Sequence, residues 1–215
     1  MGRGPISTSN YLQATPVLTA YPFTISLWIY EPSGGTGSVS VAYLSSATPS
    51  SYDGMGVTTT GIVSATSFRS GGSPISSSAQ SPSSTMLYDE WVHIAGVFAS
   101  DSSRAVFFNG TKYSDTTTVN TSPGTNDRMD IANFQGTTVS GTPNVAEFGL
   151  WDAALSDAEV VSLARGASCH LVRNSSLVTH LPLVRSNVAL RGGLTETGTV
   201  AAANTHPPII GAIAA

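Results

Sequence analysis

The acidic side chains of this chain are candidates for two kinds of chemistry, catalysis of hydrolysis and binding of calcium. Hydrolysis of a glycosidic bond needs two converging carboxyl groups, and calcium takes about six to eight oxygen ligands. The 13 acids are scattered along the chain, and Asp89–Glu90 and Asp127 with Asp130 are pairs that lie close in sequence. Both pairs fit a solvated strand end or turn better than an acid and a base. We therefore predict no catalytic carboxylate pair.

The calcium candidates are three aspartates, one in a predicted loop and two in or beside the predicted strand 129–134. Asp53 lies in the loop Ser50–Gly54, and Asp127 and Asp130 lie close together in the sequence after residue 120. No EF-hand spacing and no repeated acidic pattern accompanies them. They are the residues best placed to contribute to a calcium site, but we assign no metal and no other cofactor to the chain.

Nucleophilic and metal-dependent chemistry has little support elsewhere. His93 lies inside a predicted strand and is expected to be packed, and His206 precedes two prolines and is expected to be a structural anchor. The chain contains no Gly-x-Ser-x-Gly elbow and no phosphate-cradling Gly-x-x-x-x-Gly-Lys loop. Its one cysteine, Cys169, cannot form an internal disulfide and is expected to be a buried thiol. We predict that the protein is not an enzyme.

Aromatic side chains are the remaining candidates for ligand binding. Trp28, Trp91 and Trp151 each lie in a strand with apolar residues on both faces, which favours packing in the core over stacking on a sugar. Tyr52 lies in a serine-rich segment that we predict to be an exposed loop. It is the one ligand-binding candidate that we name.

The composition excludes several classes of protein. Charged residues make up 10% of the chain and Lys112 is its only lysine, so serine and threonine must cover most of the surface. A net charge of −4 without a Lys/Arg cluster argues against nucleic-acid binding. No apolar stretch is long enough for membrane insertion. Because no apolar run follows Arg3, we expect no secretory leader.

The elements that must position these residues are strands. Residues 91–98 and 104–108 alternate with the two-residue period of a hairpin, and Asn109-Gly110 tolerates the positive φ of a further tight turn. Other strands are predicted at residues 23–30, 38–44, 55–60, 62–69, 111–119, 129–134 and 144–152, with a loop at 45–54 and a loop or irregular edge strand at 70–84. About ten short strands indicate an all-β sandwich or barrel.

One helix interrupts this pattern at residues 156–165. Ser156 can cap the first turn while Glu159 reaches back to it, which is a capping box, and Gly166 ends the helix. Beyond it, residues 167–215 remain apolar at intervals, so we expect one or two strands and extended wrapping. We divide the chain into a sandwich, 1–166, and an extension, 167–215, that packs on the sandwich or on a partner.

Four motifs in order resemble the laminin G-like, concanavalin A-like jelly-roll superfamily. They are Phe23-Thr-Ile-Ser-Leu-Trp28, Glu90-Trp-Val-His-Ile-Ala95, Phe107-Phe-Asn-Gly110 and Leu150-Trp-Asp-Ala-Ala-Leu-Ser-Asp-Ala-Glu159. The resemblance spans roughly residues 5–166. It implies a two-sheet antiparallel jelly-roll sandwich with the short helix and extended tail, a lectin-like or protein-binding role, and often a calcium ion at the rim.

Two departures limit what the resemblance carries over. Many relatives have isoleucine and aspartate before the position of Glu147, whereas Val145 and Ala146 precede it here. The Glu-x-Asp-x-x-Glu strand of the glucanase branch does not occur in the chain. The resemblance therefore assigns neither calcium ligands nor catalytic acids.

These features together predict a non-catalytic structural or binding module. Our first hypothesis is a bacteriophage virion surface protein, of the capsid-decoration or fibre type, whose partners are capsid or other virion proteins and sister subunits. The basis is a hydroxyl-rich exterior without a leader, together with an extension that offers docking surface. The alternative is a free extracellular carbohydrate-binding or adhesin domain, whose glycan binding would respond to calcium.

Overall fold

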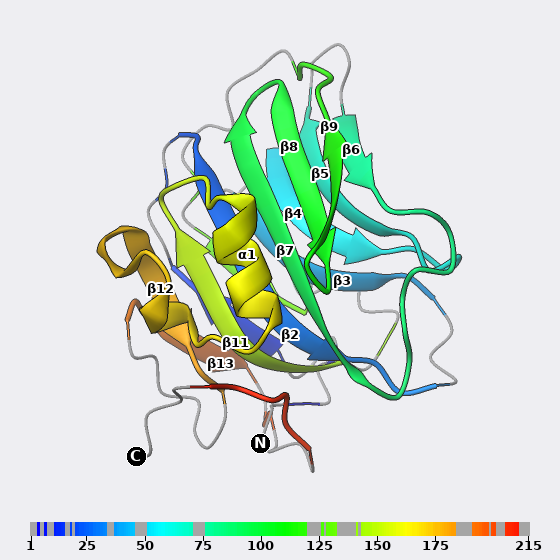
Figure 1. Ribbon diagram of the computed structural model, residues 1–215, viewed down its shortest axis with the longest axis vertical. Coiled ribbons are helices and arrows are strands. Elements are labelled where there is room, and N and C mark those ends of the chain that lie inside the picture. The colour runs from blue at the N-terminus through cyan, green and yellow to red at the C-terminus, as the bar shows by residue number, and fades with distance from the viewer. Residues whose placement is uncertain are drawn as a thin grey trace.

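The structure is a computed structural model. It describes residues 4, 7, 11–15, 18, 20–33, 37–45, 51–70, 76–119, 126, 128–132, 141, 143–183, 191–197, 199–200 and 205–210. Within them the chain forms two antiparallel sheets, stacked face to face, and one α-helix (Figure 1). This confirms the predicted all-β sandwich. No helix in the described part of the chain is long and apolar enough to cross a membrane.

The six-stranded sheet contains the motifs that stand out in the sequence. Its order is β12 (Leu177–Leu181), β11 (Asn144–Trp151), β2 (Phe23–Tyr30), β7 (Trp91–Ser100), β8 (Ser103–Phe108) and β9 (Thr111–Asp115). Strands β2 and β7 pair over eight residues, from Phe23 opposite Phe98 to Tyr30 opposite Trp91. Asn109 and Gly110 both have positive φ, 47° and 84°, which confirms the tight turn between β8 and β9.

The seven-stranded sheet closes the other side of the sandwich. Its order is β13 (Leu194–Thr197), β1 (Tyr11–Ala14), β10 (Arg128–Ile131), β3 (Val39–Ser45), β4 (Ser51–Val57), β5 (Val63–Arg69) and β6 (Ser76–Gln80). The residues beyond 166 thus supply one edge strand to each sheet, β12 and β13.

The main core fills the space between the two sheets. Alternate residues of β2 and β7 point inward, as the two-residue period of a strand requires. They meet inward residues of the seven-stranded sheet, and all are fully buried: Ile25, Leu27, Ile29, Val92, Ile94, Leu44, Met55, Ala65, Met129 and Ile131.

A second apolar layer covers the outer face of the six-stranded sheet. Helix α1 (Asp157–Ala164) lies across this face, in front of β7 and β11 in Figure 1. Two short 3₁₀ helices follow it, η1 (Cys169–Leu171) and η2 (Asn174–Ser176). Side chains of the helix and sheet pack together here, among them Val160, Leu163, Phe107 and Trp151. The central strands are therefore buried on both faces.

The predicted helix start is confirmed in detail. The Ser156 side chain accepts from the Glu159 amide, and the Glu159 carboxylate accepts from the Ser156 amide at 2.7 Å. Glu159 also pairs with Arg173 at 2.6 Å, which ties the first turn of α1 to the chain that follows η1.

One predicted loop in the seven-stranded sheet was wrong: the segment 45–54 overlaps β4, which begins at Ser51. The segment 70–84, predicted as a loop or an irregular edge strand, contains the edge strand β6. Serine and glycine have low strand propensity. These segments are strands because β4 pairs with β3 and β5, and β6 pairs with β5. Tyr52 and Asp53 consequently lie in a strand and not in a loop.

Candidate functional site

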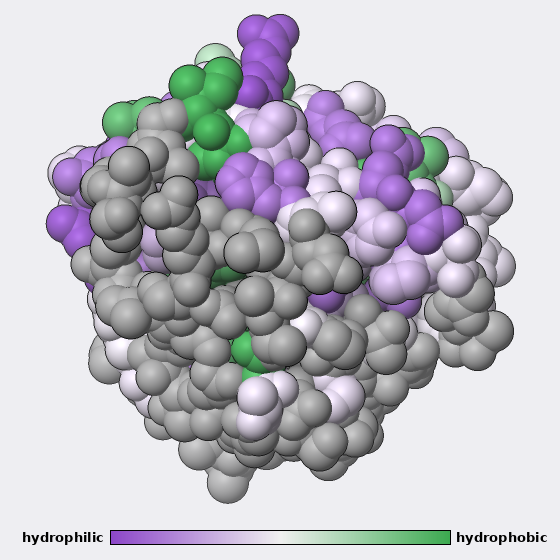
Figure 2. Space-filling view, turned by 90° about the horizontal axis from the view of Figure 1, so that it is seen from below, coloured by the Kyte–Doolittle hydropathy of each residue, from purple (hydrophilic) through white to green (hydrophobic). Residues whose placement is uncertain are grey.

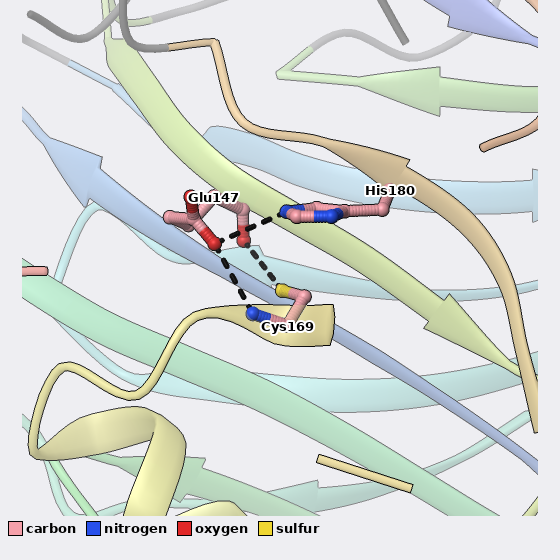
Figure 3. A group of neighbouring side chains, drawn as sticks. All are labelled: Glu147, Cys169 and His180. Carbon is pink, nitrogen blue, oxygen red and sulfur yellow. Dashed lines mark hydrogen bonds and ion pairs between the residues drawn. The ribbon is translucent and has the colours of Figure 1, made fainter. Parts of the chain in front are cut away.

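Three chemically reactive side chains meet where the six-stranded sheet is irregular. The register of β11 with β2 shifts between Ala146 and Gly149, which is a β-bulge. Glu147 lies in the bulge with φ of 47°, the left-handed region that non-glycine residues seldom adopt. Figure 3 shows its carboxylate pointing toward Cys169 of η1 and His180 of β12. The bulge thus turns a side chain of β11 toward two elements that follow it.

The carboxylate of Glu147 is held by three donors. Its Oε2 accepts from the Ser168 hydroxyl at 2.8 Å and from the Cys169 amide at 3.2 Å. The Nε2 atom of His180 lies 3.2 Å from the same oxygen, and an ionised carboxylate only accepts, so this nitrogen carries the proton. The Cys169 thiol donates to the Glu147 carbonyl oxygen at 3.3 Å. All three side chains of the cluster are buried.

Electrostatics separate the roles of the acid and the thiol. Burial acts to raise the pKa of Glu147, but the hydrogen bond and charge of His180, followed by Ser168 and the Cys169 amide, outweigh it and leave this pKa below its ordinary value. Burial, then the nearby Glu147, raises the pKa of the Cys169 thiol. The carboxylate is therefore ionised and the thiol protonated at neutral pH, so Cys169 is not an activated nucleophile.

The cluster has the composition of a metal centre. The candidate ligand atoms of Glu147, Cys169 and His180 all lie within 4.8 Å of one another. A second imidazole is close, because His170 stacks on His180 with ring centroids 5.9 Å apart. Burial leaves no path for a substrate of any size, so the arrangement suits holding an ion or locking the bulge better than catalysis. The sequence indicated the buried thiol but not Glu147 or His180 as its neighbours.

Asp53, a calcium candidate, is committed to an ion pair inside the sandwich. Both of its oxygens accept from Nη2 of Arg69, at 2.8 and 2.7 Å, and both side chains are fully buried. The Tyr21 hydroxyl donates to Asp53 at 3.1 Å, and burial, then the charge of Asp53, raises the pKa of Tyr21 to about 12. This carboxylate has no accessible oxygen for a calcium ion.

The other two calcium candidates do not join Asp53. Asp130 is buried in β10 and accepts from Arg128 and Gln13. It lies opposite Tyr43, whereas Asp53 lies opposite Leu44. Adjacent residues of a strand face opposite sides, so the two carboxylates lie on opposite faces of the sheet. Asp127 lies outside the described residues, so the two described candidates, Asp53 and Asp130, do not form one calcium site.

Tyr52 belongs to an aromatic row on the outer face of the seven-stranded sheet. Its ring stacks on Phe68 of the neighbouring strand, with centroids 5.2 Å apart and planes 15° apart. The ring of Tyr43 meets its edge at 5.3 Å. Tyr52 is half-buried and not the exposed loop residue that the sequence predicts. Burial raises its pKa.

A groove of about 320 Å³ lies on the other sheet, between α1 and the strands β7, β8 and β9. Its apolar floor includes Ala105 and Phe107, and the ion pair Lys112–Asp157, at 2.8 Å, stands at its edge. Buried Arg104 also lines it. The guanidinium of Arg104 bonds Asp115 and two carbonyl oxygens, and its Nε has no hydrogen-bond partner among the described residues. The groove thus offers donors, acceptors and an apolar surface with balanced charge.

Comparison with known proteins agrees with this architecture. The profile of the Concanavalin A-like lectin/glucanases superfamily matches residues 6–161, which is more than half of the chain. No curated protein sequence matches.

Several solved structures share the fold. A heptameric SAP-like pentraxin from Limulus polyphemus aligns with a TM-score of 0.56 and 15% identity, covering 87% of this chain and 88% of the pentraxin. Domains LG4-5 of the mouse laminin alpha1 chain align with 0.53 and 14%, covering 70% of this chain and 40% of theirs. A Trypanosoma rangeli sialidase aligns with 0.52 and 13%, but this chain covers only 27% of it.

These identities carry the fold alone, and the neighbours include both binding proteins and an enzyme. A laminin G-like fold supports a binding module in general. The four sequence motifs, the two-sheet sandwich and the profile match agree, and the chain belongs to the concanavalin A-like lectin/glucanase superfamily.

Proposed function

We propose that the protein is a non-catalytic binding module on the surface of a bacteriophage virion, as a capsid-decoration or fibre-type component. The observation that carries its non-catalytic character is that Asp53 and Glu147, the two acids that cluster with other titratable groups in the interior, are buried and already bonded. Asp53 is bonded to Arg69, and Glu147 to His180. Hydrolysis requires carboxyl groups that reach a substrate, and neither of these does.

The surface supports a role in an assembly outside the cell. Only 10% of the residues are charged, and the described residues on the face in Figure 2 are mostly pale or purple, with apolar residues in small separate groups. Contacts between neutral hydroxyl-rich surfaces depend little on salt, because they involve few ion pairs. Such contacts suit a component that must stay attached in varied media.

The extension supplies further surface for docking. Strands β12 and β13 form one edge of each sheet, and Ala167 bridges Ile210 in parallel. Leu171 and Ile210, on these two segments, are 57% and 68% exposed. These two exposed side chains give a neighbouring subunit apolar contact points beside the sheet edges.

The test is recovery of the chain in purified particles. Particles from lysed cultures of the source would be separated by size and density, and the chain quantified by mass spectrometry against the major capsid protein. We expect a fixed ratio of copies per particle across preparations. Absence of the chain from particles, or a ratio that falls with each purification step, would overturn the proposal.

A second candidate function is carbohydrate binding by a free extracellular or adhesin domain, and the groove beside α1 favours it. Its apolar floor suits the face of a sugar ring, and Arg104, Asp115, Lys112 and Asp157 supply donors and acceptors with no net charge. This balance favours a neutral sugar over an acidic one. Because the calcium candidates Asp53 and Asp130 lie on the other sheet and are already in ion pairs, we expect binding that does not respond to calcium.

A glycan array with the wild-type chain and two variants tests this candidate. Ser114→Trp would fill the groove from the exposed edge strand β9, and Ser76→Trp on β6 is the control on the other sheet. We expect binding by the wild type and Ser76→Trp and its loss in Ser114→Trp. An array on which all three proteins show no signal removes the candidate and leaves the virion role intact.

A further inference from the structure

Residue types that ligate transition metals are rare in this chain, yet several gather at one place. The chain has four histidines and one cysteine. Cys169 and His180 both contact Glu147, and His170 stacks on His180. We propose that Glu147, Cys169 and His180 bind a divalent transition-metal ion of the zinc type. This is independent of the virion role and of sugar binding.

The spacing of the ligand atoms is close to that of a zinc site. Zinc bonds of about 2.0–2.3 Å at tetrahedral angles place neighbouring ligand atoms roughly 3.3–3.7 Å apart. The separation of His180 Nε2 from Glu147 Oε2 is already 3.2 Å, and the Cys169 sulfur lies within 4.8 Å of a carboxylate oxygen of Glu147 and of a ring nitrogen of His180. A side-chain rotation that moves the sulfur by about 1 Å would complete one face of the tetrahedron.

The kind of atom decides the class of metal. Calcium and magnesium take oxygen ligands almost entirely, whereas a thiolate with an imidazole and a carboxylate suits zinc and cobalt. The site therefore differs in chemistry and place from a calcium site at the rim of the sandwich.

The surroundings of the cluster orient its ligands. The Ser168 hydroxyl and the Cys169 amide both donate to the carboxylate of Glu147, which fixes its position. The ring of His170 lies 27° from parallel to that of His180 and limits its rotation. Hydrogen bonds and packing of this kind around a metal site raise affinity by holding the ligands in place. His170 supports the site from outside, since its Nδ1 bonds the Ser168 hydroxyl, at 3.0 Å, which itself donates to Glu147.

Binding exchanges protons for metal bonds. The thiol of Cys169 gives up the proton that it donates to the Glu147 carbonyl, and this proton leaves to solvent. His180 gives up its Nε2 proton to solvent and binds as a neutral ring through the freed Nε2 lone pair, with the ring proton on Nδ1. The metal replaces the contact between His180 and the carboxylate, so the cluster exchanges weak polar contacts for coordinate bonds.

Cobalt provides a direct readout, because a cysteine thiolate bound to cobalt gives a charge-transfer absorption band that a protonated thiol lacks. The full chain, without a histidine tag, would be unfolded with chelator and refolded with one equivalent of Co²⁺ or Zn²⁺, so that burial does not block entry. We expect one ion per chain, the charge-transfer band with Co²⁺, and a rise in Tm of roughly 5–10 °C at a hundredfold excess of Zn²⁺ over Kd.

Variants separate this site from unspecific binding. Cys169→Ser and His180→Gln should weaken Zn²⁺ binding at least tenfold, and His206→Gln, which changes an exposed histidine, should leave it unchanged. Circular dichroism would report whether each variant folds. The cobalt band is measured on the wild type, so this test does not depend on whether a variant folds. Absence of the band would overturn the proposal, and so would an unchanged Zn²⁺ affinity in Cys169→Ser that is shown to fold.

Discussion

Lowering the pH from 7 to 5 should destabilise this protein by about 2 kcal/mol through one buried histidine, His93. His93 lies in β7 and is 1% exposed. Its Nε2 bonds the Ser26 hydroxyl at 2.8 Å, its Nδ1 has no hydrogen-bond partner among the described residues, and its ring meets the Trp28 ring edge-on. Burial lowers the pKa of His93 to about 3, because the charged imidazolium would lose its hydration there.

The sign and size follow from the two pKa values. Above the ordinary histidine value of about 6.5, His93 is neutral in both states and has no effect on stability. Below it, the unfolded chain takes up a proton that the folded chain refuses until the pH approaches about 3. Stability therefore falls as the pH falls, by up to about 1.4 kcal/mol per pH unit. Between pH 7 and 5 this amounts to about 2 kcal/mol.

The assay is urea unfolding at pH 7, 6 and 5 for the wild type and His93→Gln. Glutamine cannot take up the proton, and its amide can still bond Ser26, so the variant should lose about 2 kcal/mol less than the wild type over this range. Acidic groups titrate alike in both proteins and cancel in the comparison. His206→Gln, at an exposed site, should behave as the wild type does. An equal loss of stability in His93→Gln and the wild type would refute the reasoning.

The other predictions concern stability and are checked by denaturant unfolding at neutral pH. Arg69→Leu should lower the free energy of unfolding by about 3–5 kcal/mol, because it leaves the buried Asp53 carboxylate without its cation. Adding Asp53→Leu should restore much of this loss. An Arg69→Leu protein as stable as the wild type would contradict a stabilising role for the ion pair. Gly54→Ala should lower the free energy of unfolding by about 1–3 kcal/mol, since the new Cβ would lie 2.3 Å from the Tyr43 ring. The same substitution made in a Tyr43→Ala protein should cost less, because the ring is gone. Ser156→Ala should cost about 1 kcal/mol by removing the cap of α1, and an unchanged midpoint would show that the cap contributes nothing.

Much of the fold was predictable because its strongest signals are local. The alternation in β2 and β7, the turn at Asn109-Gly110 and the capping box at Ser156 each depend on residues a few positions apart. The predictions that Trp28, His93 and Trp151 pack in the interior are confirmed. Trp91, for which packing was also predicted, is only half-buried, because it lies at the first position of β7.

The candidate cluster could not be predicted in the same way. Glu147 is 22 residues from Cys169 and 33 from His180. No spacing rule relates a bulge in one strand to a 3₁₀ helix and to the strand that follows. The same holds for Asp53, whose ion pair with Arg69 depends on the register of β4 with β5.

The sequence by itself determined the all-β class, the central hairpins, the capped helix and the family resemblance, because backbone geometry and two-residue periodicity are read along the chain. Only the tertiary structure decided which polar groups meet and which reach solvent. It made strands of two serine-rich segments through pairing with their neighbours, and it buried Asp53 and Asp130. It also turned Glu147 toward Cys169 and His180 through one residue with positive φ. The physical reason is that charge pairing and desolvation depend on distance in space, which sequence separation does not record.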